Sequence, residues 1–479
     1  MPTGYPDTMS NAAAGIFRAY DIRGVVGEDL TSDVAVLVGK AFGTTVLRGR
    51  GNRVLIGRDG RLSSPELSSA LCDGIRSTGC NVVDVGLGPT PNLYFGLHHL
   101  RADGGIQVTG SHNPPEYNGF KTCIGTDTIS GDAIQDLRKL IEDDDFESGE
   151  GSYETCDLVP AYKAALYARI NLQRPLRIAV DSGNGVAGPI APEIYRHLGC
   201  EVIEMYSEVD GNFPNHHPDP TVEDAVVDLQ AKVISEGLDL GLGFDGDADR
   251  VGIIDDNGDI VWGDKLTLLL ARDVLERNPG ASVIFDVKCS QQLHDDIKAH
   301  GGRPIMWKTG HSLMKRKMKD EGAILGGEMS GHLFFAENFF GHDDAIYAGA
   351  KLMEIASKCN GGFSDLLSDL PDTFATPEIR RESSDEAKFQ VCERLREELA
   401  KEFEVIDIDG VRALCDGGGG LARPSNTGPI IVLRFEAESP ARLSEIQQLF
   451  IERLDRIESE LSPGAVSYTH LTLPTNREV

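Results

Sequence analysis

The sequence lacks the patterns expected of a secreted or membrane-bound protein. Its nine cysteines are odd in number, scattered, and never form a Cys-x-x-Cys pair, which is typical of reduced thiols in the cytoplasm. No basic patch followed by an apolar core stands near the start, so no signal peptide is expected. No apolar run reaches the roughly 18 residues that span a bilayer. We therefore expect a soluble, cytoplasmic protein.

Positive charge is also scarce. The 479 residues contain 46 lysines and arginines against 76 aspartates and glutamates, a net charge of −30. This balance argues against nucleic acid or an anionic membrane as a partner. Because charges are screened over roughly 8 Å at physiological salt, a pocket that gathers a few cations can still bind an anionic substrate. Local clusters of arginine and lysine therefore matter more than the total charge.

One α/β pattern recurs three times along the chain. In the first copy, the strand-like residues 53–57 precede a helix with Ser64 as its expected N-cap, and the strand-like residues 81–85 follow. The same order returns at 176–204 and at 282–307. These recurrences predict three related α/β domains with mixed, largely parallel sheets.

The last part of the chain has another order, which predicts a smaller α+β domain. The expected elements are a helix at 385–402, strands at 405–408 and 411–414, a glycine-rich turn at 417–420, a strand at 429–435 and a helix at 440–459. We expect four domains and a tail, with limits at 1–156, 157–259, 260–371, 372–465 and 466–479. The tail is interpreted as non-native or disordered, because it continues no pattern that precedes it.

A serine on a stiff loop is the first candidate for chemistry. Thr109 to Lys121 reads TGSHNPPEYNGFK, in which two prolines restrict the backbone and Lys121 adds a cation near Ser111. Such a setting would stabilise a phosphoserine. A lone loop serine is more often a capping or solvated hydroxyl, and an acyl-transfer role for Ser111 with His112 stays open.

Three alternating carboxylates follow a second apolar run. Asp245, Asp247 and Asp249, in the sequence DGDADR, can point their oxygens at one hard cation, and Mg²⁺ is the natural ligand. A solvated acidic turn is the plainer interpretation. The apolar residues after Arg250 argue against an EF-hand, and a phosphatase with an aspartyl nucleophile stays open.

Two further strings combine polar groups in short loops. GGEMSGH, at 326–332, offers a carboxylate, a hydroxyl and an imidazole that suit sugar hydroxyls, and RPSNTGP, at 423–429, offers a guanidinium, hydroxyls and backbone N–H groups that suit a phosphate. Each string alone would be interpreted as an ordinary turn.

Together and in this order, the four strings resemble the α-D-phosphohexomutase superfamily. The bacterial phosphomannomutase/phosphoglucomutase group is the nearest likeness, on the further strings FRAYDIRG, EVDGNFPNHHPDP, FDVKCS, WKTGHS and GEMSGH. The resemblance covers nearly everything from Phe17 to Pro463. It implies three similar α/β domains and a fourth domain that acts as a mobile lid.

The resemblance also implies a reaction and its residues. Ser111 would carry a phosphoryl group, pass it to a hexose phosphate and take the other phosphate back from a hexose 1,6-bisphosphate, which also acts as activator. Mg²⁺ would be held by Ser111, Asp245, Asp247 and Asp249. Candidates for proton transfer or charge stabilisation are Arg23, His112, Lys121 and His332. Candidates for substrate binding are Tyr20, Arg250, Lys288, His311, Glu328, Met329, Ser330, Gly331, His332, Arg423, Pro424, Ser425, Asn426 and Thr427.

The partners implied are small hexose phosphates, and the family expectation is a monomer. The metal loop departs from the family in having Ala248 where glycine is commoner, which would impair the loop only if that position needs a positive φ. The alternatives are a phosphoglucosamine mutase, a Mg²⁺-dependent sugar phosphatase and a sugar-phosphate-binding protein without catalysis.

Overall fold

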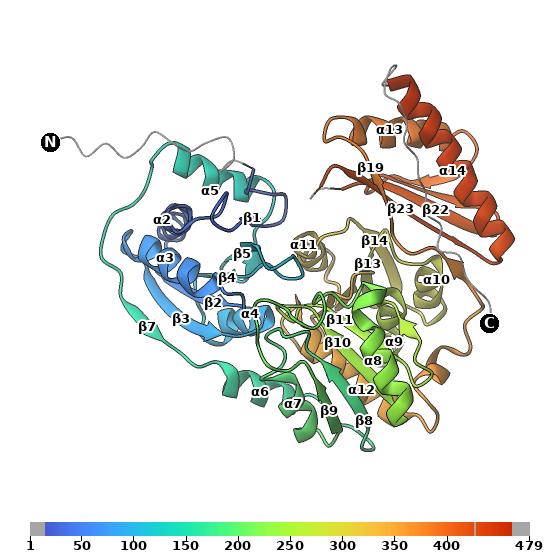
Figure 1. Cartoon of the computed structure of the whole chain (residues 1–479), viewed down its shortest axis with the longest axis horizontal. Helices are drawn as coiled ribbons and strands as arrows, with labels where there is room; N and C mark the ends of the chain where they lie inside the picture. The colour runs from blue at the N-terminus through green and yellow to red at the C-terminus, as the bar shows by residue number, and fades with distance from the viewer. Residues whose placement is uncertain (1–14, 426–427, 462–479) are drawn as a thin grey trace. The chain divides into compact units, whose positions relative to one another are not determined.

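The computed structural model describes residues 15–425 and 428–461 (Figure 1). The chain divides into two compact units, one up to Leu370 and one from Pro371 on. Three sheets with their helices make up the first unit, and a fourth sheet lies in the second. Among the described residues, no helix is both long and apolar enough to cross a membrane.

The first sheet has the strand order β1-β5-β4-β2-β3-β7, with β6 paired to β5. Its strands are β1 Ile22–Val25, β2 Arg53–Arg58, β3 Asn81–Leu87, β4 Gly104–Val108, β5 Tyr117–Ile124, β6 Asp127–Thr128 and β7 Tyr153–Thr155. The neighbouring strands β4, β2, β3 and β7 run parallel to one another, and β7 forms the edge of the sheet. The helices are α2 Ser32–Arg48, α3 Ser64–Arg76, α4 Thr90–His99 and α5 Asp132–Glu142, with α2 packed beside α3 (Figure 1).

Helix α3 forms where the sequence predicts a helix, and it buries Leu67, Leu71 and Ile75. The expected N-cap was wrong. Ser63 occupies the cap position, and Ser64 is the first helical residue. The hydroxyl of Ser64 instead donates to Asp59 at 2.5 Å, because the loop before the helix turns a carboxylate toward it.

The second and third sheets repeat the same plan. The second has the order β12-β11-β10-β8-β9 and the third β14-β13-β15-β16-β17. In each, three parallel strands continue into an antiparallel extension. The strands are β8 Arg177–Asp181, β9 Glu201–Met205, β10 Leu240–Phe244, β11 Val251–Ile254, β12 Ile260–Val261, β13 Ser282–Asp286, β14 Arg303–Trp307, β15 Leu325–Gly327, β16 Leu333–Phe335 and β17 His342–Asp343.

The helices around these two sheets mostly share one continuous apolar core, although the helices at 223–236 and 311–321 pack into two smaller apolar clusters. The helices are α6 Val159–Tyr167, α7 Ala191–His197, α8 Glu223–Glu236, α9 Gly263–Arg277, α10 Gln291–Ala299, α11 His311–Glu321, α12 Ala345–Lys358 and the short 3₁₀ helix η1 Ser364–Leu367. The fully buried residues Leu242 of the second sheet and Phe285 of the third belong to this core. The expected border at 259/260 falls inside the β11–β12 hairpin of the second sheet.

The second unit is an antiparallel sheet of order β18-β23-β22-β21-β20, with β19 paired to β23. Its elements are β18 Phe374–Ala375, β19 Ile379–Glu382, α13 Ala387–Leu399, β20 Glu404–Ile406, β21 Val411–Cys415, β22 Gly418–Pro424, β23 Ile430–Ala437 and α14 Pro440–Leu461. The expected glycine-rich turn at 417–420 was wrong, because Gly418 to Gly420 pair with both β21 and β23. The predicted tail, 466–479, lies outside the described residues.

Four parallel strands of the first unit, β4, β10, β13 and β15, lead into the polar strings singled out in the sequence. The serine loop follows β4, the metal loop follows β10, FDVKCS begins in β13 and GEMSGH begins in β15. Ligand sites in open α/β sheets lie outside the carboxyl ends of the parallel strands. The sheets of the first unit thus present the predicted strings at the positions where such sites form.

Candidate functional site

The serine loop places the Ser111 hydroxyl against the metal loop. Ser111 is only 2% exposed, and its Oγ donates to Oδ2 of Asp245 at 2.9 Å. Nδ1 of His112 lies 3.1 Å from Ser111 Oγ. Burial, together with the nearby Arg250 and Arg23, holds the pKa of His112 well below its usual 6.5. The serine therefore stands between a carboxylate and an imidazole that is neutral at pH 7.

The three aspartates of the metal loop are all fully buried, and ligand atoms of the three lie within 4.8 Å of one another. Oδ1 of Asp245 closes the loop by accepting the backbone N–H groups of Asp249 and Arg250, both at 3.1 Å. Burial and the charges of Asp247 and Asp249 raise the pKa of Asp245 well above 3.8. A cation among these carboxylates would relieve that repulsion.

The donor set fits Mg²⁺. Oδ1 of Asp247 is buried and has no hydrogen-bond partner among the residues that the structure describes. Its Oδ2 accepts the Thr90 hydroxyl at 2.5 Å and the Lys121 ammonium at 2.7 Å. Lys121 also pairs with Asp249. Oxygen-only ligands suit a hard divalent ion.

Ala248, which stands where the family more often has glycine, adopts the positive φ that the sequence analysis named as unfavourable for alanine. Ala248 has a φ of 58°, in the left-handed region that favours glycine, and is fully buried. An alanine in this conformation costs roughly 1 kcal/mol. All three carboxylates nevertheless converge, so the loop keeps its ligand geometry despite the alanine.

A β-bridge between Arg250 and His332 joins the metal loop to the sugar loop. The backbone N–H of Val251 donates to the carbonyl of Gly331 at 3.2 Å. Gly331 has a φ of 86°, and a Cβ there would lie 2.5 Å from the Val251 carbonyl oxygen. Glycine is therefore required for this approach, which brings residues more than 80 positions apart in the sequence into one site.

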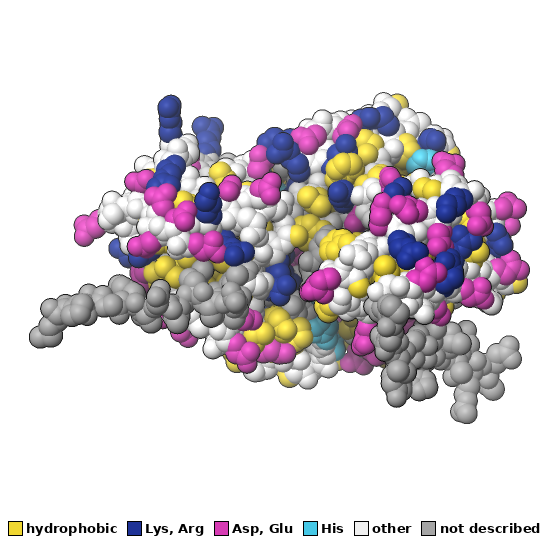
Figure 2. Space-filling view, turned by 90° about the horizontal axis from the view of Figure 1, so that it is seen from above, with side chains coloured by type: hydrophobic (Ala, Val, Ile, Leu, Met, Phe, Trp, Pro, Cys, Tyr) yellow, Lys and Arg dark blue, Asp and Glu magenta, His cyan; other side chains and the backbone are white. Residues whose placement is uncertain are grey.

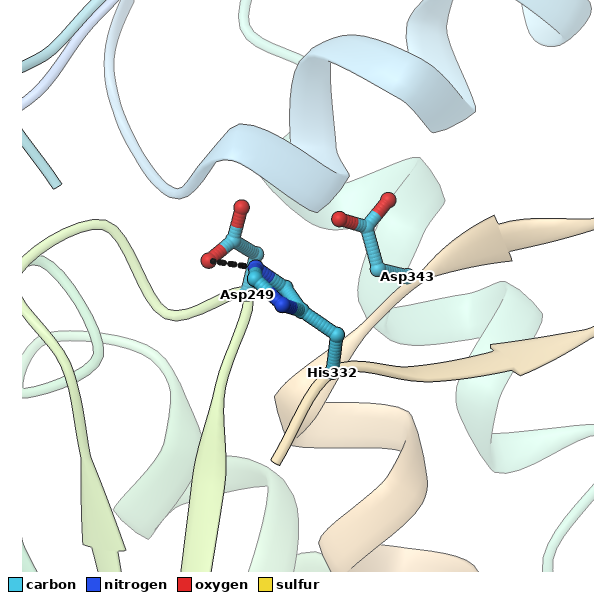
Figure 3. A group of neighbouring side chains, drawn as sticks. All are labelled: Asp249, His332 and Asp343. Carbon is cyan, nitrogen blue, oxygen red and sulfur yellow. Dashed lines mark ion pairs between the residues drawn. The ribbon is translucent and has the colours of Figure 1, made fainter. Parts of the chain in front are cut away.

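His332 lies between two carboxylates. Its Nδ1 is 2.8 Å from Glu328 Oε2. Its Nε2 is 3.3 Å from Asp249 Oδ1, the ion pair drawn as a dashed line in Figure 3. Burial lowers the pKa of His332, but Asp249 and Glu328 outweigh burial and raise it to about 9. The ligand atoms of Asp249, His332 and Asp343 also lie within 4.8 Å of one another. Because both nitrogens of His332 already face carboxylates, the all-oxygen triad fits Mg²⁺ better than this second group.

His311 and Tyr20 complete this side of the site. His311 begins α11, and its ring stacks on His332 with centroids 5.8 Å apart. Burial, followed by the charge of Lys315, holds the pKa of His311 well below 6.5. A Cβ on Gly310 would lie 3.0 Å from the Tyr20 ring, so Tyr20 packs directly on the start of α11. The two adjacent histidines thus have opposite preferences for a proton.

The three strings of the third sheet are joined by a residue that the sequence did not single out. Asp286 accepts the Thr309 hydroxyl at 2.8 Å and the backbone N–H of Met329 at 3.1 Å. Glu328 accepts the backbone N–H of Gly310 at 2.5 Å. Ser330 Oγ lies 3.2 Å from His332 Nδ1. Burial raises the pKa of Asp286 above 3.8, although the charge of Lys288 opposes this effect. Burial acts in the same direction on Glu328, but His332, with a smaller contribution from the partly buried Lys288, outweighs it and lowers the pKa of Glu328 below 4.5.

Arg23 reaches the serine loop from β1. It donates to Oδ1 of Asn113 at 2.5 Å and pairs with Asp21. Further polar residues that sequence reasoning missed are Thr90, Asp286, Lys315 and Asp343. Lys315 Nζ is 2.9 Å from Asp343 Oδ1. Asp286 stood within the quoted string FDVKCS, but neither Thr90 nor the Lys315–Asp343 pair carried a sequence signal, because only the fold brings them to the site.

The phosphate string lies in the second unit. Arg423 and Pro424 belong to β22 and pair with Val432 and Ile431 of β23. Arg423 Nε donates to Asp409 at 2.9 Å. Ser425 continues the ladder by donating its N–H to the Ile430 carbonyl at 2.9 Å. Asn426 and Thr427 lie outside the described residues.

Acidic and basic side chains alternate over the face seen in Figure 2 rather than forming separate fields. The net charge of −30 is thus not gathered into one acidic field on this face. Lys121, Arg250 and Arg23 lie near the serine loop or the metal loop and supply local positive charge.

Comparison with known proteins gives matches along almost the whole chain. Four consecutive models of the phosphoglucomutase/phosphomannomutase family match: alpha/beta/alpha domain I at 14–148, domain II at 160–258, domain III at 262–374 and the C-terminal domain at 378–453. A phosphomannomutase/phosphoglucomutase of Pseudomonas aeruginosa is 49% identical over 94% of this chain and 97% of its own length. A phosphoglucomutase of Neisseria gonorrhoeae is 46% identical over 92% and 97%.

A solved structure is also similar. The phosphoglucomutase/phosphomannomutase family protein of Burkholderia thailandensis is 46% identical, covers 94% of this chain and 98% of its own, and has a TM-score of 0.89. Three mixed α/β sheets followed by an antiparallel C-terminal domain are the architecture of the α-D-phosphohexomutase superfamily. Within this superfamily, the chain belongs to the phosphoglucomutase/phosphomannomutase family.

Proposed function

We propose that this protein is a phosphomannomutase/phosphoglucomutase that interconverts hexose 1-phosphate and hexose 6-phosphate through a phosphoserine at Ser111. The observation that carries the proposal is the hydrogen bond from Ser111 Oγ to Asp245, one of three buried carboxylates that converge beside it. Mg²⁺ held by Asp245, Asp247, Asp249 and Ser111 would offset the negative charge of the phosphoryl group.

In each transfer, one P–O bond breaks and another forms. The phosphoryl group leaves Ser111 Oγ for a free hydroxyl of the sugar phosphate, which loses its proton, and a hexose 1,6-bisphosphate results. Lys121 and Arg250 stabilise the charge of the transferred group. His112, neutral and 3.1 Å from Ser111 Oγ, accepts the serine proton when the second phosphate returns. His332, whose pKa of about 9 keeps it protonated between Asp249 and Glu328, stabilises negative charge in the site. In the first transfer, His112 takes the proton of the sugar hydroxyl and gives it to Ser111 Oγ as the phosphoryl group leaves.

The bisphosphate must turn around between the two transfers, so the site has to accept the sugar in both orientations. We assign ring contacts to Glu328, Met329, Ser330 and Gly331, with Tyr20, Lys288 and His311 beside them. Arg23 supports the serine loop through Asn113. The phosphate that does not react would be gripped by Arg423, Pro424, Ser425, Asn426 and Thr427. The proposed domain limits stay those stated from the sequence, apart from the limit at 259/260, which moves past Val261 so that the β11–β12 hairpin stays in the second domain.

Escape of the bisphosphate would leave Ser111 without its phosphoryl group. Hexose 1,6-bisphosphate therefore acts as an activator that restores it. We further propose a cytoplasmic monomer whose partners are small hexose phosphates and not nucleic acid, in keeping with the charge balance.

The experiment is to incubate purified protein with glucose 1-phosphate, mannose 1-phosphate or glucosamine 1-phosphate, with Mg²⁺ and a trace of the bisphosphate. Isomerisation of the glucose and mannose esters without free phosphate is the expected result. Preference for the glucosamine ester would instead identify a phosphoglucosamine mutase. Release of inorganic phosphate would identify a phosphatase, and binding without turnover would contradict catalysis altogether.

A further inference from the structure

Arg61 is a buried arginine that holds the backbone of the serine loop. It is 1% exposed. Its guanidinium donates to four carbonyl oxygens of this loop: Pro114 at 2.6 Å, Tyr117 at 2.9 Å, Ser111 at 2.8 Å and Asn113 at 2.6 Å. Few side chains other than arginine could supply these donors in one rigid plane. The Arg61 side chain therefore fixes the backbone conformation of the serine loop.

Asp59 holds Arg61 in turn. Asp59 Oδ2 is 3.2 Å from Arg61 Nε, and Oδ1 accepts the Arg61 backbone N–H at 3.0 Å. The backbone N–H of Gly110 donates to Oδ2 at 3.2 Å. Burial lowers the pKa of Arg61 below its usual value, and the Asp59 carboxylate opposes that effect. Asp59 and Arg61 thus form a buried ion pair, and both of its members also hydrogen-bond to the backbone of the serine loop.

The segment 208–220, which follows β9 of the second sheet, packs on the Arg61 guanidinium. The Phe213 ring lies 5.2 Å from the Arg61 guanidinium carbon, in a cation–π contact. Phe213 has a φ of 49°, which is a rare conformation for a bulky residue. Strained residues of this kind persist where the surrounding structure imposes them. The string EVDGNFPNHHPDP (208–220), for which the reaction gave no role, supplies this ring.

The loop that Arg61 holds is also the one that meets the metal loop. A Cβ on Gly246 would lie 2.6 Å from the Ser111 carbonyl oxygen. That carbonyl is therefore fixed between Arg61 on one side and Gly246 on the other. Ser111 itself has a φ of 50°, so its backbone is held in a conformation that the free chain disfavours.

We propose that Arg61, covered by Phe213, is a positioning residue that sets the distance and direction of Ser111 Oγ relative to Asp245. The inference rests on the proposed function, since it assigns the support of the reacting hydroxyl. Among the described residues, Arg61 forms no hydrogen bond or ion pair with the Ser111 hydroxyl or with the three aspartates of the metal loop. It therefore acts through the backbone.

The main test is Arg61→Lys, which keeps the charge but cannot bind four carbonyls in one plane. We expect kcat to fall about 100-fold, because a misplacement of about 1 Å has that effect on a reacting group. KM should change less than about twofold, since the sugar contacts lie elsewhere. The rate at which hexose 1,6-bisphosphate phosphorylates Ser111, followed by intact mass, should fall in parallel. A folded variant with a wild-type kcat would overturn the proposal.

A milder variant keeps the proposal testable if Arg61→Lys does not fold. Phe213→Leu removes the ring but leaves Arg61 in place, and we expect kcat to fall roughly fivefold, the value of one cation–π contact. The matched control is Phe339→Leu, whose ring lies 5.8 Å from Arg169 in the same unit. The control should keep kcat. An equal loss of kcat in both variants, or in neither, would contradict a specific role for Phe213.

Failure of the inference is distinguishable from failure of the proposed function. If the wild-type protein neither isomerises hexose phosphates nor takes up a phosphoryl group, the proposed function is wrong. If the wild-type protein does both and the Arg61 and Phe213 variants match it below their melting temperatures, only the positioning role is wrong.

Discussion

The serine loop and the phosphate string have similar compositions but different structures. Both combine serine, asparagine, proline and glycine. In the first, four carbonyls converge on one buried arginine and the serine is 2% exposed at a φ of 50°. In the second, Arg423 to Ser425 continue an ordinary antiparallel ladder. The chemistry of a loop therefore depends on what packs beneath it, and the sequence of the loop alone does not contain that information.

The largest expected difference between the two regions lies in their serines. Ser111→Ala removes the group that carries the phosphoryl, so turnover should fall on the order of 10⁴-fold. Ser425→Ala removes one hydrogen bond and should lower kcat/KM about fivefold. Steady-state kinetics on glucose 1-phosphate measures both. Comparable losses in the two variants would break the comparison.

Removal of the metal should affect the serine loop and the metal loop but not the phosphate string. Chelation with EDTA should abolish turnover, and added Mg²⁺ should restore it, since three buried carboxylates would then repel one another. Hydrogen exchange should become faster in the serine loop and the metal loop and stay unchanged in β23. Full activity after exhaustive chelation would rule out the metal, and faster exchange in β23 would contradict the separation.

The arginine of the phosphate string should act mainly on binding. Arg423→Lys loses the planar pair of donors, so we expect KM to rise about tenfold while kcat changes less. Arg381→Lys is the matched control, because Arg381 pairs with Asp455 and Glu458 of α14. It should lower the melting temperature and leave KM unchanged. An unchanged KM in the Arg423 variant, with a raised KM in the Arg381 variant, would contradict a role for Arg423 in phosphate binding.

The smallest expected effect concerns two neighbouring histidines in the segment 208–220, whose Phe213 packs on Arg61. Burial lowers the pKa of His216, but Asp181 at 3.0 Å outweighs it and raises the pKa above 6.5. Its stabilising effect is therefore complete below pH 6.5 and is lost as pH rises through the higher folded value. His216→Asn should lower the unfolding free energy by less than about 1 kcal/mol, and only at acidic pH.

His217 should behave in the opposite way. Burial lowers its pKa below 6.5, so the folded protein favours the neutral ring and loses stability as pH falls through 6.5. His217→Asn should therefore gain stability relative to the wild type at acidic pH. Thermal melting of both variants between pH 5 and 9 measures the two slopes. Slopes of the same sign would contradict the electrostatic account of this segment.

The sequence predicted the order of strands and helices well, because each element carries its own periodicity and most have clear end signals. Helix α3 and the β8–α7–β9 unit show this. The glycines at 418–420 were misinterpreted because their strand partners β21 and β23 are both needed to outweigh the turn preference of glycine.

The candidate site was predicted mainly by resemblance and by quoted strings. The structure brings Ser111, Lys121, the three aspartates and His332 together. Residues that act through the fold were not predicted. Arg61 lies 50 positions before Ser111, and Asp343 meets Lys315 across two elements of the third sheet's region. No local pattern marks such residues, because their partners are distant in the chain.

The most direct measurement is transfer of labelled phosphate from hexose 1,6-[³²P]bisphosphate to the protein, followed by mapping of the labelled peptide. The account predicts label on the peptide that contains Ser111, and its loss on adding unlabelled hexose 6-phosphate as quickly as turnover proceeds. Label on an aspartate of the metal loop, or active enzyme that never takes up label, would contradict it.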